Sequence, residues 1–574
     1  MRRMVAAVCA VIAASAAQAA ERVALVGATI VDGNGGAPVK DGVVVLEGDR
    51  ILAVGPRATV AVPRGVRTVD VAGKWITPGL IDAHVHFSQS GGLYTRPDAV
   101  DLRKVVPYED DVARSKARLD ETFARYLASG VTTVVDAGGP MWNFEVRRRA
   151  MASAQAPRVA AAGPLIATEP TEPQAKLDFG GRFIISATDT AHARRLAQAQ
   201  LAAKPDFIKI WGIGSGPQGV ARVRDMTRAV AEVAHGAGIR VAVHATDLAI
   251  AEAALAGGAD ILVHSVEDAP LPAAFLEAMK ARGTVYITTA MVMEGYYDAF
   301  LGRPDLTAVE RKLGAPDIIQ SLTEMPAGVI AQTRNALPAD SLKQILLNAK
   351  AAVAAGVRVA AGTDAGNIGT LHGPALHREL QLLSRAGLTP AQVLTAATRD
   401  AAFAYSPKPD IGLIAPGYRA DLLVLDADPL ASVTNLTRIA TVWSRGRPLD
   451  PGTLLKPTPE SVVQLQLERY NAKDVEGFLA TYSDDAEIFD RPGQSAAAAS
   501  GKAALRKIYS GLFAKQPQVI CRVPQRTVEG RFVIDQEVCA RTPDSKPVHA
   551  TAIYEVIDGK IRRVWFAAAD SPKT

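Results

Sequence analysis

Histidines and one aspartate recur at the ends of short apolar runs. His84 and His86 end one such run, and residues two apart on a strand face the same side. Further runs end in His244, His264 and Asp364. A single strand-end histidine is more often a core residue than a ligand. Several of them at corresponding strand ends, together with an aspartate, predict a metal site of the ligand types that zinc accepts.

A lysine interrupts another of these runs. Lys209 lies in Phe207–Trp211 with apolar neighbours on both sides, and burying an unpaired ammonium is costly. In one interpretation the apolar stem extends to the rim of the fold and leaves the amine in water. In the other, the amine stays buried, its pKa is lowered, and it has a chemical role. The residues alone leave both open.

The elements that position these side chains form a repeated pattern. Between Ile76 and Tyr405, short apolar runs alternate with Ala-rich helical stretches. Repeated βα units predict a (β/α)8 TIM barrel, whose active site lies at the C-terminal ends of its parallel strands. An open doubly wound sheet is the alternative. The predicted strands are Ile76–Phe87, Val131–Ala137, Arg158–Ile166, Phe207–Trp211, Ile239–Ala245, Ile261–Ser265, Thr284–Ala290 and Val357–Asp364.

We expect an α/β chain of several domains. Val-rich and Gly-rich runs on both flanks of the barrel predict one small β-sandwich. The pattern of apolar and polar residues changes again after three prolines near residue 455. The predicted ranges are 1–20 for a signal peptide, 21–75 and 406–451 for the β-sandwich, 76–405 for the barrel, 452–459 for a linker and 460–574 for an α+β domain.

Composition limits the partners and the compartment. A net charge of +5 over 574 residues is too dilute to predict a nucleic-acid partner. Arg2 and Arg3 precede an apolar run and then small residues up to Ala20, which predicts a cleaved signal peptide and a secreted or periplasmic protein. Beyond it, no apolar run is long enough for a membrane span.

Two cysteines remain after the predicted cleavage. Cys521 and Cys539 flank a turn centred on Gly530, which places them opposite each other on a predicted hairpin. A cross-strand disulfide suits an oxidising compartment, whereas two buried thiols facing by chance would need no bond. The sequence leaves both interpretations open.

The motifs around the strand-end residues resemble the amidohydrolase superfamily. The resemblance covers Val23 to about Pro451 and is carried by Ile76–His86 around the first histidines, by Ala361–Gly366 around Asp364, and by Pro416–Leu425 in the returning β-segment. Within the superfamily, the lysine in Phe207–Trp211 is similar to that of the imidazolonepropionase-like, Xaa-Pro dipeptidase-like group.

This resemblance implies a centre with two divalent ions, most simply zinc. His84, His86 and Asp364 would hold one ion, His244 and His264 the other, and carboxylated Lys209 would bridge them. A hydroxide between the ions would attack the substrate, and Asp364 would act as general base and then acid. The implied reaction is hydrolysis of an amide in a dipeptide, an N-acyl amino acid or a cyclic amide. A lactone or an organophosphate ester is the alternative substrate.

Substrate contacts are less well marked. His372 lies in the loop after the last predicted strand, Trp211 ends the strand of Lys209, and Tyr296 opens a long segment after the seventh strand. We expect these three side chains to line the substrate site, because binding residues concentrate on loops at the mouth of the scaffold.

The C-terminal segment resembles the SnoaL-like, nuclear-transport-factor-two-like domains. Tyr470–Asp474 and the final hairpin around Asp558 and Gly559 carry this resemblance. It implies an α+β cone that serves as an accessory module for a homodimer or higher oligomer. The alternative is that the cone binds or isomerises a small molecule and that the barrel is its scaffold.

Overall fold

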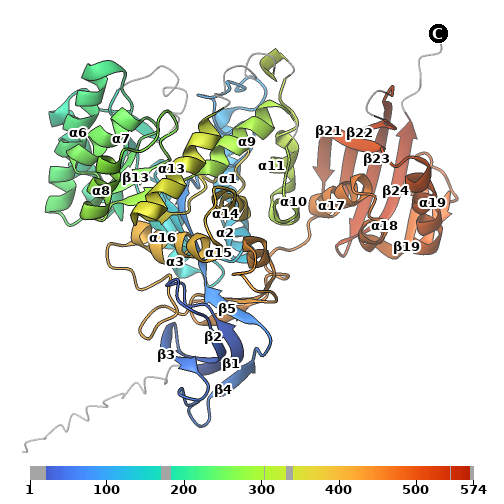
Figure 1. The fold of residues 1–574 in the computed structure, drawn as a ribbon. Helices are drawn as coiled ribbons and strands as arrows, with labels where there is room; N and C mark the ends of the chain where they lie inside the picture. The colour runs from blue at the N-terminus through green and yellow to red at the C-terminus, as the bar shows by residue number, and fades with distance from the viewer. Residues whose placement is uncertain are drawn as a thin grey trace, which may run out of the picture.

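The computed structural model describes residues 21–169, 183–302, 304–326, 328–330, 340–542 and 545–568. The predicted signal peptide, residues 1–20, lies outside the described residues. Within these ranges, no helix combines the length and apolarity that crossing a bilayer requires. A small β-domain, a larger α/β domain and a C-terminal α+β domain follow one another in Figure 1.

The small β-domain takes strands from both ends of the α/β domain. Its sheet has the order β18-β17-β16-β5-β1-β2-β3, with β4 paired to β1. Antiparallel pairing of β16 with β5 joins the two flanks, and Leu25, Val44 and Trp443 are buried in its core. The strands are β1 Arg22–Ile30, β2 Val39–Glu47, β3 Arg50–Pro56, β4 Arg67–Asp70, β5 Trp75–Pro78, β16 Leu422–Leu425, β17 Ile439–Ser444 and β18 Arg447–Leu449.

The α/β domain is built on parallel strands in two runs, β6-β7-β8 and β10-β9-β11-β12-β13-β14-β15. Backbone bonds from Ala83 to Ala361 and from Asp364 to His84 link the last strand to the first. The predicted strands follow one another in the order expected for a barrel, whereas β10, at the edge of the longer run, was not predicted. The strands are β6 Leu80–Val85, β7 Val131–Asp136, β8 Arg158–Ala161, β9 Leu165–Ala167, β10 Ile184–Ser186, β11 Phe207–Trp211, β12 Arg240–His244, β13 Ile261–Val263, β14 Val285–Ile287 and β15 Arg358–Ala360.

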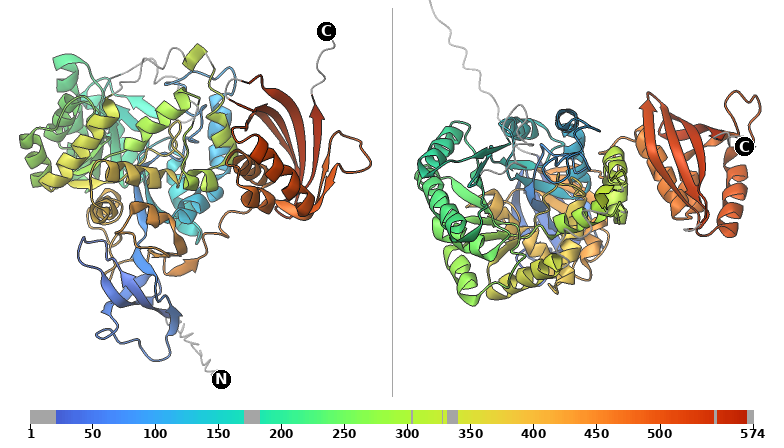
Figure 2. Two further views of the ribbon diagram at one scale, coloured as in Figure 1. Left: turned by 45° about the vertical axis from the view of Figure 1, so that its right-hand side comes forward. Right: turned by 90° about the horizontal axis from the view of Figure 1, so that it is seen from above.

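Helices surround these strands (Figure 2, right). The strands β6 and β7 are buried at every position, as parallel strands covered by helices must be. The helices are α1 Tyr108–Ala117, α2 Leu119–Ala128, α3 Asn143–Ala152, α5 Thr190–Leu201, α6 Gly216–Gly236, α7 Leu248–Gly257, α8 Ala273–Arg282, α9 Ala290–Phe300, α10 Ala308–Leu313, α11 Pro316–Ser321, α13 Ser341–Ala355, α14 Ala375–Arg385, α15 Pro390–Ala396 and α16 Arg399–Tyr405, and the 3-10 helix η1 is Val433–Thr437.

Two of the predicted strands are each divided in the structure. The run from Ile76 breaks at Gly79 into β5 and β6, which belong to different sheets. A side chain at Gly79 would collide with Thr132, since a Cβ there would lie 2.1 Å from its Oγ1. The run from Arg158 divides into β8 and β9 around Pro164, which has no N–H to donate to a ladder.

The C-terminal domain packs helices on one face of a sheet of order β20-β19-β24-β23-β22-β21. Phe478, Tyr509 and Tyr554 are buried between the two layers. Helix α17 contacts α11 of the barrel domain, and the Gln320 amide donates to the carbonyl of Val523. The elements are α17 Pro459–Asn471, α18 Val475–Ala480, β19 Tyr482–Phe489, β20 Ala499–Ser500, α19 Gly501–Lys515, β21 Ile520–Glu529, β22 Phe532–Ala540, β23 Val548–Ile557 and β24 Lys560–Ala568.

The two cysteines of this domain are bonded to each other. Cys521 on β21 and Cys539 on β22 are direct cross-strand partners and form a disulfide. Their strands meet at a turn in which Gly530 has a φ of 56°, a left-handed conformation that glycine adopts at little cost. The hairpin register that follows from this turn therefore places the two sulfur atoms within bonding distance.

Candidate metal centre

The strand-end histidines, Lys209 and Asp364 meet in one pocket at the C-terminal ends of the parallel strands. β6 carries His84, β11 carries Lys209, and β12 ends at His244. The other ligands lie in the turns that follow their strands. The pocket has a volume of about 270 Å³, and its lining includes His86, Lys209, His244, His264 and Asp364. His84 is fully buried beneath it.

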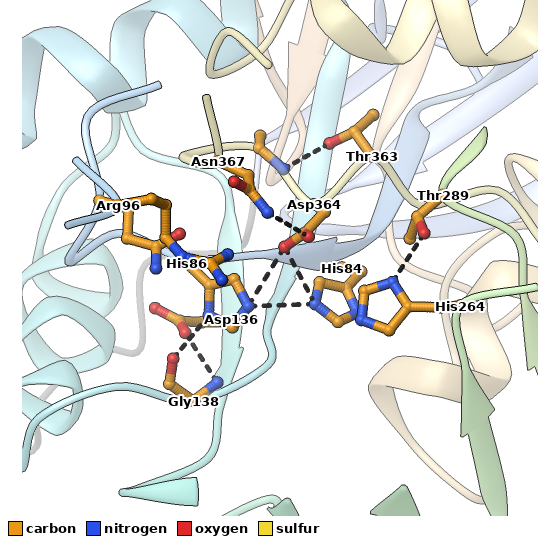
Figure 3. A network of polar contacts seen from close by, with 12 residues as sticks. His84, His86, Arg96, Asp136, Gly138, His264, Thr289, Thr363, Asp364 and Asn367 are labelled. Carbon is orange, nitrogen blue, oxygen red and sulfur yellow. Dashed lines mark hydrogen bonds and ion pairs between the residues drawn. The ribbon is translucent and has the colours of Figure 1, made fainter. Parts of the chain in front are cut away.

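The first three ligand atoms converge closely (Figure 3). Nε2 of His84 and Nε2 of His86 are 3.1 Å apart. Both atoms approach Oδ1 of Asp364, at 3.3 and 3.2 Å. These side chains can each offer one ligand atom within 4.8 Å of the others. Two imidazole nitrogens and a carboxylate oxygen that face a common point form a ligand set that suits a divalent ion.

Contacts on the outer side of the rings fix their orientation. Nδ1 of His86 lies 2.7 Å from the carbonyl oxygen of Gly138, which can only accept, so this nitrogen carries a proton and Nε2 is the atom that faces the cluster. Nδ1 of His264 lies 2.8 Å from Oγ1 of Thr289. Such outer contacts are usual for histidines that bind metal, because they set the tautomer and the direction of the ligand nitrogen.

The remaining histidines lie beside the first cluster. The ring centres of His84 and His264 are 4.9 Å apart, and those of His264 and His244 are 4.5 Å apart. Burial lowers the pKa of His84 to about 3, and the pKa values of His244 and His264 fall well below the ordinary value for the same reason. The rings are therefore neutral at pH 7, which is the form that binds metal.

Lys209 is fully buried. Its side chain is only 1% exposed, and no hydrogen-bond acceptor among the described residues reaches Nζ. The interpretation in which its stem extends to solvent is therefore wrong. Burial lowers the pKa of Lys209 to about 7, so a substantial fraction of the amine is neutral near neutral pH.

Asp82 ties together the two segments that carry the first three ligands. Its Oδ1 accepts the N–H groups of His84 and Thr363, and its Oδ2 accepts the Thr363 hydroxyl at 2.7 Å. Thr363 directly precedes Asp364, whose φ of 62° is unusual for a residue other than glycine. These bonds hold that backbone conformation and direct the carboxylate toward the histidines.

A relay of polar contacts leads from Asp364 to the pocket wall. The Asn367 amide donates to Oδ2 of Asp364 at 2.9 Å, and the Tyr296 hydroxyl donates to Oδ1 of Asn367 at 2.8 Å. Burial alone would raise the pKa of Asp364, but its contacts with His84 and His86 hold that pKa well below the usual range. The carboxylate is therefore ionised and has one oxygen directed at the cluster.

The three predicted substrate contacts separate into two groups. Trp211 and Tyr296 line the pocket. His372 does not: it stacks on Phe87, and its ring nitrogens contact the Tyr126 hydroxyl and the Gln89 carbonyl, both at 2.8 Å. The prediction for His372 was wrong because the loop turns back and packs this ring against the neighbouring helix.

Sequence reasoning missed several polar residues of the pocket. Gln89 and Arg96 follow β6, Glu267 follows β13, and Asn367 follows Asp364. Each lies in a loop after a strand, and loop positions show no periodicity that reveals where a side chain points. Their closeness to strand-end histidines was the one available signal.

Comparisons with known proteins agree with this site. The model of the amidohydrolase family matches residues 75–449, and that of the SnoaL-like domain matches residues 463–564. The imidazolonepropionase of Caulobacter vibrioides is 28% identical over 282 residues, which are 45% of this chain and 66% of that protein. The imidazolonepropionase of Rhizorhabdus wittichii is 28% identical over 420 residues, 69% of this chain and 90% of its own.

Solved structures share the fold. A provisional prolidase from Bifidobacterium longum has a TM-score of 0.58 and 25% identity, covering 78% of this chain and 98% of its own. The ochratoxinase of A. niger has a TM-score of 0.57 and 22% identity over 75% of this chain and 96% of its own. Because the family model spans more than half of the sequence, and its region contains the strand-end ligands, the chain belongs to the amidohydrolase family, with a SnoaL-like domain at its C-terminal end.

Proposed function

We propose that the protein is a metal-dependent hydrolase of amide bonds in a dipeptide, an N-acyl amino acid or a cyclic amide. The observation that carries this proposal is the convergence of His86, Lys209, His244, His264 and Asp364 in one pocket. Membership of the amidohydrolase family supports it. Structures of the same fold include a Xaa-Pro dipeptidase, 20% identical with a TM-score of 0.57 over 75% of this chain and 100% of its own.

Two divalent ions, with zinc as the first candidate, fit the donor set. His84, His86 and Asp364 would hold one ion, and His244 and His264 the other. When bound, the ions would lower the pKa of water and polarise the substrate carbonyl. The neutral state of the buried histidines and the fixed tautomer of His86 support this assignment.

Lys209 would bridge the two ions as a carbamate. Its neutral amine would form an N–C bond to carbon dioxide and lose one proton, which converts a buried base without a partner into a carboxylate-like anion. The absence of a hydrogen-bond partner for Nζ among the described residues supports this step, because an unpaired buried ammonium is costly.

Asp364 would move the proton during the reaction. Its ionised Oδ1 faces the ligand histidines and can accept a proton from the attacking water, while Asn367 holds Oδ2. The same carboxyl group can then donate the proton to the leaving amine. This sequence is general base and then general acid catalysis by one residue.

We also propose export and assembly. The disulfide between Cys521 and Cys539 suits an oxidising compartment, as the sequence of residues 1–20 predicts. Exposed apolar side chains on the C-terminal sheet, Ile520, Val528 and Val548, support a role of that domain in forming a homo-oligomer. Peptide sequencing of the exported form and analytical ultracentrifugation test these two points.

The experiment that tests the function combines metal analysis with a substrate panel. The protein is produced with added zinc and bicarbonate, and the panel contains dipeptides, N-acyl amino acids, cyclic amides, lactones and organophosphate esters. We expect about two ions per chain, amide hydrolysis, loss of activity with a chelator and its return with zinc. Cleavage of esters alone would reassign the substrate class. Less than one ion per chain, with no hydrolysis, would overturn the proposal.

A further inference from the structure

The pocket carries an ionisable group on each side of the ligand cluster. Arg96 lies in the loop after β6, and Glu267 lies in the loop after β13, three residues beyond His264. Both side chains line the same cavity as the ligands. Figure 3 shows Arg96 beside His86 and, across Asp364 and His84, His264 on the opposite side. A molecule bound over the cluster can therefore meet one cationic and one anionic side chain.

Asp98 binds one edge of the Arg96 guanidinium, and the other edge is available to a ligand. Its Nε and Nη2 donate to the two oxygens of Asp98 at 2.7 and 2.6 Å. Its side chain is 16% exposed, and no acceptor among the described residues contacts Nη1. Asp98 thus fixes the plane of the guanidinium and leaves N–H groups directed at the pocket. A planar, fixed pair of donors suits a carboxylate.

Glu267 is the anionic member of this pair of ionisable side chains. It is half-buried, and no cation or hydrogen-bond donor among the described residues contacts its carboxylate. Burial raises the pKa of Glu267, and the nearby carboxylates of Asp247 and Asp268 raise it further. A carboxylate in an electronegative part of a pocket with no cation of its own favours a ligand that supplies one, and an ammonium group supplies both charge and donors.

We propose that Arg96 and Glu267 select a zwitterionic substrate, an unblocked dipeptide whose carboxylate binds Arg96 and whose α-ammonium binds Glu267. This inference rests on the proposed function and narrows it. It ranks free dipeptides above N-acyl amino acids, which lack the ammonium, and above cyclic amides. It also sets the direction of the substrate. The residue that carries the carboxylate is the one that leaves as the amine from any dipeptide, and binding at Arg96 would place it on the Asp364 side of the cluster, where the proton donor lies.

The first test uses the zinc-loaded full-length protein and three forms of the dipeptide that it cleaves best: free, N-acetylated and C-amidated. We expect kcat/KM to fall by about 10-fold or more with each block, which is the loss of one good charge-assisted contact. Equal kcat/KM for all three forms would overturn this inference and leave the amidohydrolase function intact. No hydrolysis of any compound by the metal-loaded protein would instead be a failure of the proposed function.

Variants then assign each contact. Arg96→Lys keeps the charge beside Asp98 but loses the fork, so KM for the free dipeptide should rise about 10-fold while the amidated form changes little. The control is Arg103→Lys, because Arg103 makes the same two-point contact with Asp101 in the same loop but does not line the pocket. If Arg96→Lys and Arg103→Lys had the same KM for the free dipeptide, Arg96 would not bind the carboxylate and this part of the proposal would be wrong.

For the amine end, Glu267→Gln should abolish the preference for the free form over the N-acetylated form. Its matched control is Glu277→Gln, which makes the same change at an exposed position on α8 that does not line the pocket. If Glu267→Gln kept the full preference of the parent protein, the ammonium would bind elsewhere and the zwitterion assignment would be wrong.

Discussion

Nδ1 of His264 lies 2.8 Å from Oγ1 of Thr289, and both residues have a left-handed backbone, with φ values of 72° and 57°. Neither is a glycine, so each conformation costs about 1–3 kcal/mol unless its surroundings enforce it. Thr289 directly precedes α9, which carries Tyr296 into the pocket. The contact therefore joins one of the proposed ligand histidines to a helix of the pocket wall.

Loss of the Thr289 hydroxyl should weaken the metal centre. In Thr289→Val the side chain keeps its shape but the hydrogen bond between its hydroxyl and Nδ1 of His264 is lost, so the ring loses the contact that orients it. We expect zinc affinity to fall by about 10- to 100-fold, the usual cost of removing such an outer contact. Competition with a fluorescent chelator measures this affinity. Thr289→Ser restores the hydroxyl and should bind zinc like the parent protein; equal affinity of the Val variant would show that the contact does not orient His264.

Glu379 also stabilises the turn that contains Thr289. On α14 it is fully buried, and its carboxylate accepts from the Thr288 hydroxyl and, at 2.7 Å, from the N–H of Met291. Burial raises its pKa from 4.5 to about 7. An acid whose pKa is raised in the folded state adds stability while it is protonated. That stability is fully present below about pH 4.5 and is lost as the pH rises through about 7.

Glu379→Gln should therefore change how stability depends on pH. The variant cannot titrate at this position, so its free energy of unfolding should improve relative to the parent protein by on the order of 3 kcal/mol between pH 4.5 and pH 7. Denaturant unfolding at several pH values measures the difference. Glu277→Gln, an exposed position on α8, is the control and should show none. A constant difference across this range would mean that Glu379 does not titrate there.

The convergence of the proposed ligands could be predicted from the sequence because strand ends constrain their positions. In a parallel barrel the residue at the end of each strand must face the common mouth, so His244 and Asp364 could be grouped although 120 positions separate them. Arg96 and Glu267 could not be placed in this way. Their loops follow no repeat, and the contacts that direct them, such as Asp98 beside Arg96, form only in the folded chain.

Packing explains where the sequence predictions failed. His372 follows Asp364 by eight residues, which suggested a place at the mouth, but its ring completes an aromatic cluster with Phe87 and Tyr126. The divided strands have a similar origin. Gly79 lets the chain pass closely over Thr132 into a second sheet, and a one-dimensional apolar pattern carries no information about which sheet a strand joins.

Replacement of Lys209 should remove activity in a way that a small acid reverses. Lys209→Ala deletes the buried amine, and hydrolysis should fall by on the order of 100-fold or more because the anion that would bridge the ions is lost. Propionate or a similar short acid should partly restore the rate by placing a carboxylate in the vacated space. Lys343→Ala, on the exposed side of α13, is the control. Full activity without added acid would exclude a bridging role for Lys209.

The disulfide should stabilise the C-terminal domain and leave the metal centre unaffected. Cys521 and Cys539 are separated by 18 positions, and closing a loop of that length restricts the unfolded chain by about 3 kcal/mol. The double variant Cys521→Ser, Cys539→Ser should therefore unfold at a lower temperature in the transition of this domain, seen by calorimetry. Zinc content and hydrolysis should stay at the parent level, because neither cysteine lines the metal pocket. If the double variant lost hydrolytic activity as well as thermal stability of the C-terminal domain, the expectation would be wrong. The hairpin that the disulfide closes would then be coupled to the active site through the contact of Gln320 with Val523.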